Sequence, residues 1–157
     1  MNSEYINIYN NLVNLSRNKN LFFNFTEKDT FSDRLLIFFF HLAFFFKYFK
    51  SKIDQKYMQN FYDYVFRQIE LDIREIGYGD QTVNKKMKTY VNLLYSIINK
   101  FESWEKSNYD QKNLVFKFFI EIKDNNENFV DYFVKYTNYL SKTSLNSFTK
   151  SVINHKF

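Results

Sequence analysis

The sequence predicts an all-α protein, a single compact bundle of about six or seven helices with a tight Gly-x-Gly helix hairpin in the middle. The chain of 157 residues has no proline and only two glycines, so few positions interrupt a helix. Apolar residues recur at helical spacing along most of the chain. No linker or internal repeat divides it, and residues 1–157 are therefore expected to form one domain.

Two helices are expected before residue 51. The first covers about residues 4–18, and the second ends near residues 48–50. The apolar stripe of the first is Tyr5, Ile8, Leu12 and Leu15, and the N-cap candidates of the second are Asp29, Thr30 and Ser32. The most apolar stretch, residues 35–46, would span only ~18 Å as a helix, against ~30 Å of hydrocarbon in a bilayer. This length favours a buried core helix over a membrane re-entrant segment.

Two long helices are expected in the middle of the chain, one beginning near Asp54 and one running from Gln81 to about Glu102. Their apolar stripes are Phe61, Val65, Ile69, Ile73 and Ile76 in the first, and Val83, Met87, Tyr90, Val91, Leu94, Ile98 and Phe101 in the second. The outward pairs Asp63–Arg67 and Glu70–Arg74 have the spacing that supports a helix. Further helices are expected over residues 110–123, 129–140 and 145–153, and the inner face of the 129–140 helix is Phe129, Phe133, Tyr136 and Leu140.

Both glycines fall in the stretch Arg74–Lys88, REIGYGDQTVNKKMK, between the two long helices. Gly77 stands just after a helix end, where a left-handed residue is common, and glycine adopts that conformation without a steric penalty from a Cβ atom. Gly79 permits a second sharp turn, and Asp80 is a suitable N-cap for the next helix. The two glycines are therefore expected to be structural residues of the loop.

The charges around this loop are placed unfavourably for the helix dipoles. Asp72 and Glu75 lie near the negative end of one helix, and Lys85, Lys86 and Lys88 lie near the positive end of the next. Two interpretations stay open: the two sets pair across the hairpin, for example Glu75 with Lys85 or Lys86, or the loop presents them to a partner. The partner-binding candidates are Arg74, Glu75, Asp80, Lys85, Lys86 and Lys88.

Catalysis is not expected from the residues present. The chain has no cysteine, no glycine-rich phosphate loop and no serine elbow, so the sequence predicts no catalytic, cofactor-binding or metal-binding residue. His41 lies inside the apolar run and is expected to be a core residue bonded to a backbone or hydroxyl group. Binding of haem or a quinone-type molecule through His41 is the alternative for this residue.

The net charge of +5 permits attraction to nucleic acid or to an anionic membrane. The charge is weak evidence for such binding, because lysine is abundant together with asparagine, isoleucine and aromatic residues. This composition is typical of AT-rich coding sequences. Lys85, Lys88 and Asn92 share a polar helix face. The alternative function is therefore a basic helical RNA- or ribosome-binding module.

The glycine stretch resembles a pattern of the ubiquinol–cytochrome c reductase assembly chaperones, especially the alphaproteobacterial type. The pattern falls on Arg74, Glu75, Ile76, Gly77, Gly79, Asp80, Val83, Lys85 or Lys86, Met87 and Lys88, with Tyr78 where the family usually has valine. Residues 61–72, and the opening of the apolar helix after Asp29, are also similar to the family. The resemblance is strongest over residues 29–102 and rests on helical pattern alone in the last third.

This resemblance implies an assembly chaperone for the cytochrome bc1 complex (respiratory complex III) that binds nascent or unassembled cytochrome b and is not an enzyme. A small partner protein or the ribosome is a further partner that it implies, with peripheral contact to the inner membrane; no cofactor and no DNA binding are expected. The first residues, MNSEYINIYNN, lack the features of a targeting segment. We therefore expect a bacterial cytoplasmic location at the inner face of the inner membrane.

Overall fold

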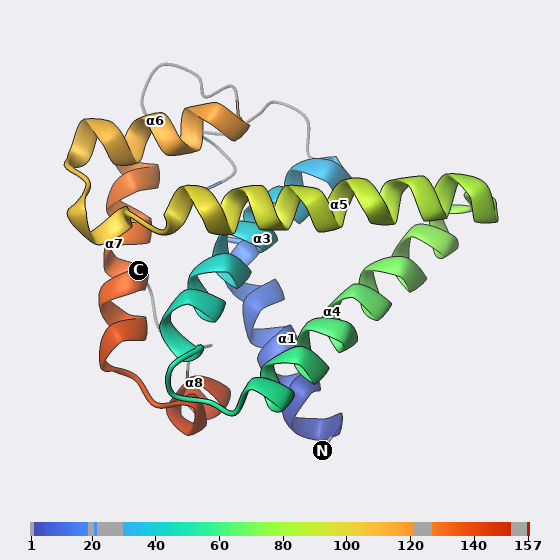
Figure 1. The fold of residues 1–157 in the computed structure, drawn as a ribbon, viewed down its shortest axis with the longest axis horizontal. Helices are drawn as coiled ribbons and strands as arrows, with labels where there is room; N and C mark the ends of the chain where they lie inside the picture. Colours follow the sequence, from blue (N-terminus) through green and yellow to red (C-terminus); the bar gives the residue numbers. More distant parts are fainter. Residues whose placement is uncertain (1, 19–20, 22–29, 121–126, 152–156) are drawn as a thin grey trace.

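The computed structural model of the chain describes residues 2–18, 21, 30–120, 127–151 and 157, which form seven α-helices and one short 3-10 helix (Figure 1). These elements are α1 Asn2–Ser16, α3 Phe31–Phe49, α4 Gln55–Ile76, α5 Asp80–Phe101, η1 Trp104–Lys106, α6 Tyr109–Phe119, α7 Glu127–Lys142 and α8 Leu145–Ser151. The prediction of an all-α bundle of six or seven helices is confirmed. The N-cap candidate Asp29 and the predicted helical residues 121–123 and 152–153 lie outside the described residues.

Helix α3 is the centre of the bundle, because it packs against α1, α5 and α7. Thr30 caps it: the threonine hydroxyl accepts from the Asp33 N–H, and the Asp33 carboxylate accepts from the Thr30 N–H. Residues 37–45 are buried without interruption, so this helix is apolar on all sides. The prediction of a buried core helix is confirmed.

Aromatic rings fill the space around α3. The Phe44 ring stacks on the Phe101 ring of α5 with 4.0 Å between centroids, and Phe40 meets Phe116 of α6 edge to face at 5.2 Å. Such offset and edge-to-face pairs are the preferred arrangements of aromatic rings. The inner face predicted for α7 is confirmed, because all four of its residues are buried.

A few polar bonds tie the helices together inside this apolar packing. Asn11 of α1 donates through Nδ2 to the carbonyls of Phe148 and Thr149 on α8, at 3.0 and 3.1 Å. Lys47 of α3 donates to the carbonyls of Phe101 and Glu102 at the end of α5, at 2.9 and 2.7 Å. A cation at the carbonyl end of a helix is favoured by the helix dipole.

The connection between α4 and α5 is three residues long, 77–79. Gly77 is left-handed with φ 106°, as predicted, and its N–H donates to the Arg74 carbonyl. The N-cap prediction for Asp80 is wrong: Gly79 is the N-cap without a side-chain bond, and Asp80 is the first residue of α5. The connection that the sequence predicted as a tight hairpin joins two helices that diverge in a V (Figure 1).

The apolar stripes of the long helices are largely as predicted. In α4, Phe61, Val65, Ile69 and Ile73 are buried. Ile76 is an exception, because 53% of its surface is exposed. It ends α4 beyond the point where the neighbouring helices cover it, so its side chain is available on the surface.

Candidate functional site

A groove of about 510 Å³ lies between α1, α3 and α4. Its lining residues are Tyr9, Val13 and Ser16 from α1 with Arg17 directly after it, Phe31, Arg34, Leu35 and Phe38 from α3, and Ile69, Asp72, Glu75 and Ile76 from α4. Within each helix most lining residues are spaced three or four apart, and residues with this spacing project from one face of a helix. We call this feature the α1–α3–α4 groove.

The apolar part of the groove is made by buried side chains of two helices. Leu35 and Phe38 of α3 and Ile69 of α4 are all nearly inaccessible to water. The Tyr9 ring packs edge to face on Phe38 with 5.5 Å between centroids. These packed side chains form the floor of the groove and fix its shape, and the large apolar side chain left accessible to a partner is Ile76 at the rim.

Two carboxylates, Asp72 and Glu75, form the acidic edge of the groove on α4. Partial burial raises the pKa of Asp72, and the nearby charge of Glu75 raises it further. Burial also raises the pKa of Tyr9 to about 12, with a second contribution from the Asp72 charge. The two carboxylates thus repel each other beside an apolar surface, and a cation from a partner would relieve that repulsion.

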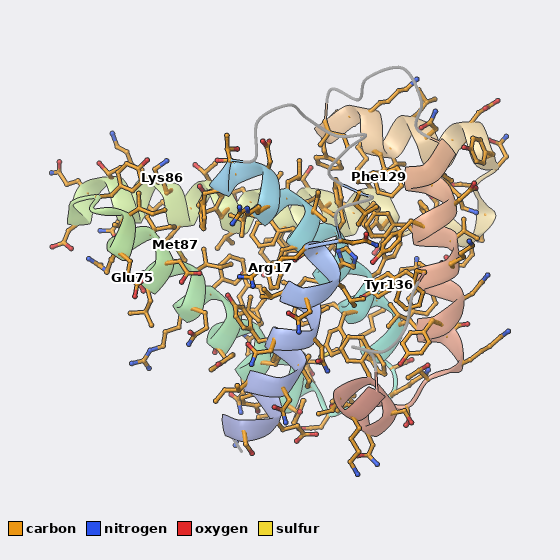
Figure 2. The ribbon with its side chains drawn as sticks, turned by 180° about the vertical axis from the view of Figure 1, so that it is seen from behind. Arg17, Glu75, Lys86, Met87, Phe129 and Tyr136 are labelled. Atoms are coloured by element: carbon orange, nitrogen blue, oxygen red, sulfur yellow. The ribbon has the colours of Figure 1, made fainter. Side chains whose placement is uncertain are left out.

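Arginine side chains provide positive charge on the other side of the groove. Arg17 directly follows the last residue of α1, Arg34 lies in the first turn of α3, and both line the groove. Figure 2 shows the positions of Arg17, directly after α1, and Glu75, near the end of α4. A second, more polar hollow of about 790 Å³ shares Tyr9, Val13, Arg17 and Asp72 with the groove and extends to Lys150 on α8.

The predicted partner-binding residues divide into four groups. Arg74 pairs with Asp80 across the connection, and with Glu70 at 3.1 Å within α4 as predicted. Glu75 reaches the groove instead. The Lys86 ammonium lies 4.7 Å from the centroid of the Tyr78 ring.

Lys85 and Lys88 are exposed on α5, together with Asn92. Within the described part of the chain, Glu75 forms no ion pair with Lys85 or Lys86. The structure therefore does not contain the cross-hairpin pairing that was one of the two interpretations. Asp63 likewise accepts from Gln59 at 2.9 Å rather than pairing with Arg67.

His41 is a fully buried core residue with both ring nitrogens bonded. Nδ1 lies 2.8 Å from the Ile37 carbonyl oxygen, and Nε2 lies 2.7 Å from the Tyr132 hydroxyl. A carbonyl can only accept, so Nδ1 carries the proton and Tyr132 donates to Nε2. Burial lowers the pKa of His41 to about 4, and the ring is neutral at pH 7. The prediction of a bonded core histidine is confirmed.

Sequence reasoning missed the α1 and α3 walls of the groove, above all Tyr9, Arg17 and Arg34. Tyr9, Val13 and Arg17 are spaced four residues apart, which indicates one helix face. That spacing does not indicate which helix the face meets. The groove depends on how three helices from distant parts of the sequence converge, and this is a tertiary feature.

Comparison with protein families gives one finding: the family described as Ubiquinol-cytochrome C chaperone matches residues 24–153. The chain belongs to the ubiquinol–cytochrome c chaperone family. The match extends the likeness seen over residues 29–102 into the last third of the chain. Comparison with curated proteins and with solved structures gives no match. The alphaproteobacterial type stays a prediction.

The family assigns this chaperone a role with the cytochrome bc1 complex. The matched residues include the α3 and α4 walls of the groove, whereas the α1 wall precedes them. Across the described residues, no helix combines the length and apolar character needed to cross a membrane. The α4 wall is also where the glycine stretch begins, so the groove and the sequence pattern meet at Glu75 and Ile76.

Proposed function

We propose that this chaperone binds newly made cytochrome b, holds it until haem insertion and subunit joining, and receives a segment of it in the α1–α3–α4 groove. The observation that carries the proposal is the position of Glu75 and Ile76. They belong to the sequence pattern shared with the family, and they also line the groove. A protein that holds an apolar client needs exposed apolar surface bordered by polar groups, and the groove supplies both.

The exposure of Ile76 supports this role in particular. It is a large apolar side chain, 53% exposed, at the rim of a groove whose interior is apolar. Because about half of this side chain is already covered, burying the rest against a client contributes about half of the 1.5–3 kcal/mol of a full burial, or roughly 1 kcal/mol. Glu75, one position earlier, adds a charge that favours a client segment with a lysine or arginine beside its apolar residues.

The alternative of a basic RNA- or ribosome-binding module has less support. Arg74 is held by two carboxylates, and Lys86 lies over the Tyr78 ring. Lys85 and Lys88 then remain as the exposed cations of the glycine stretch. Two cations supply a weak phosphate-binding surface, because the affinity for nucleic acid grows with the number of phosphates that the protein neutralises.

A small partner protein, or the ribosome that makes cytochrome b, is a further proposed partner. Because cytochrome b is a membrane protein, we place the chaperone peripherally at the inner face of the inner membrane. The polar hollow beside the groove reaches Lys150 and shares Arg17 and Asp72 with the groove, so a second protein bound there would lie directly against the client.

Complementation of a deletion strain tests the proposal. Ile76→Asp puts a charge on the groove rim, and we expect it to lower assembled complex III and haem-loaded cytochrome b at unchanged transcript level. Leu71→Asp is the matched control, because Leu71 lies on the same helix, is 48% exposed and does not line the groove. Native gels and the cytochrome b absorption band measure the result.

Normal complex III in the deletion strain would reject the chaperone role itself. Normal complex III with Ile76→Asp would reject the groove as the client site while leaving that role in place. Equal loss with both variants, at equal protein level, would also reject the groove. The two parts of the proposal therefore fail separately.

A further inference from the structure

Helix α6 is apolar on two opposite faces. Its inner face packs on the core through the fully buried Phe116 and the half-buried Val115 and Phe119. Its outer face carries Leu114 and Phe118, which are 63% and 64% exposed. They lie one turn apart, so they project side by side. A surface helix normally has a polar outer face, and an apolar one indicates that something covers it.

The size of this outer face argues against a protein partner or a second copy of the chain. An aromatic side chain buries roughly 150–250 Å² at most, so Leu114 and Phe118 together offer roughly 200–300 Å². A stable protein interface buries about 800 Å² per partner. Two side chains of this exposure instead suit shallow insertion between lipid headgroups.

The surrounding charges indicate which lipids fit. The Lys100 ammonium of α5 lies 4.4 Å from the centroid of the Phe118 ring, and Lys117 is exposed between Leu114 and Phe118 in the helix. Tyr109, 40% exposed, begins the same helix. Lysines that keep their charge in water beside inserted aromatic rings are typical of membrane-surface helices, and they attract anionic headgroups.

We propose that the outer face of α6, formed by Leu114 and Phe118 with Lys100 and Lys117, binds an anionic lipid surface. It adds a specific surface to the peripheral membrane contact proposed above. The face lies at the opposite end of α5 from the glycine connection (Figure 1). The chaperone can therefore rest on the membrane through α6 while the end of α4 stays accessible to a client.

Co-sedimentation of the purified chain with vesicles tests this inference without any client. The vesicles are equal parts phosphatidylcholine and phosphatidylglycerol, or phosphatidylcholine alone. We expect binding to the anionic vesicles that weakens with salt, and a loss of about tenfold or more in Leu114→Ser with Phe118→Ser. Ile6→Ser with Leu71→Ser is the matched control, because both residues are exposed apolar side chains on other helices.

The α6 substitutions are expected to leave folding unchanged, because both side chains are exposed. Circular dichroism checks the fold of each variant. Absence of binding to anionic vesicles would overturn the inference, as would equal loss in the control. A wild-type dimer that becomes monomeric in the α6 variant, seen by analytical ultracentrifugation, would also overturn it. Because no cytochrome b is present, none of these outcomes depends on the client proposal.

Discussion

At the scale of single residues, Gly77 shows how a backbone requirement can be separated from a packing requirement. Its φ of 106° is unfavourable for any residue with a Cβ, yet a Cβ placed there would meet no atom within 4 Å. Gly79 also has open space around it, but its φ of −74° and ψ of 166° suit any residue. The two glycines of one loop therefore differ only in backbone conformation.

We predict that Gly77→Val lowers the free energy of unfolding by ~1 kcal/mol or more, because a β-branched residue is strained at positive φ. Gly79→Ala should lower it by less than ~1 kcal/mol, since alanine adopts the observed conformation and this gain offsets its weakness as an N-cap. Urea unfolding of both variants measures the difference. Equal effects of the two substitutions would contradict the assignment of Gly77 as the strained position.

His41 makes stability depend on pH in one direction. Its pKa is lowered from 6.5 to about 4 by burial, so the native ring stays neutral while the unfolded ring binds a proton below pH 6.5. The unfolded state then holds more protons, and stability falls as pH decreases from about 6.5 to about 4. Above pH 6.5 this contribution is complete and constant.

We predict that His41→Gln flattens this dependence, so that its unfolding free energy changes less than that of the wild type between pH 7 and pH 5. The slope is compared rather than the absolute stability, because the substitution also disturbs the bonds to Ile37 and Tyr132. Carboxylates contribute equally to both proteins. Identical slopes would contradict this account, because they would show that the pKa of His41 is the same in the folded and unfolded states.

At the scale of elements, the ion pairs around the α4–α5 connection indicate which charged residues stabilise the connection and which are available to a partner. The structure pairs Arg74 with Asp80, and it leaves Glu75 on the groove and Lys86 over Tyr78. Exposed charges that do not touch contribute independently to stability. The charges that the sequence singled out therefore differ in their surroundings: Arg74 and Asp80 hold the connection, whereas Glu75 faces the groove.

We predict that Glu75→Lys and Lys86→Glu each change the free energy of unfolding by less than ~1 kcal/mol, and that the double variant equals their sum within ~0.5 kcal/mol. The Arg74→Ala and Asp80→Ala cycle is the control and should show coupling, because this pair is in contact. A double variant of Glu75 and Lys86 that restores lost stability would support pairing across the connection.

The helices themselves were predictable because local signals agree. The absence of proline, the helical spacing of apolar residues and the capping residues Thr30 and Asp54 all indicate the same boundaries. The N-cap of α5 was predicted wrongly because aspartate is favoured both as an N-cap and in the first turn of a helix. Asp80 is the first residue of α5, and Gly79 is its N-cap. The exposure of Ile76 could not be predicted, because helical spacing alone places it on the apolar stripe.

At the scale of the whole molecule, the arrangement of three helices creates a site that no single segment contains. The α1–α3–α4 groove joins residues from Tyr9 to Ile76, and α3 holds the walls in place through its buried aromatic packing. The family pattern includes Glu75 and Ile76 of this groove, but only Glu75 was among the predicted partner-binding residues. The α1 wall was not predictable, because the packing of α1 on α3 decides it.

The central claim, that cytochrome b occupies this groove, is tested most directly by photo-crosslinking in cells that make tagged cytochrome b. The photoreactive residue p-benzoylphenylalanine is placed at Ile76 or at Tyr95, which is also 53% exposed but does not line the groove. We predict a crosslink to cytochrome b from position 76 and little or none from position 95. Crosslinking from position 95 alone, or from neither position while both variants support complex III assembly, would contradict the account.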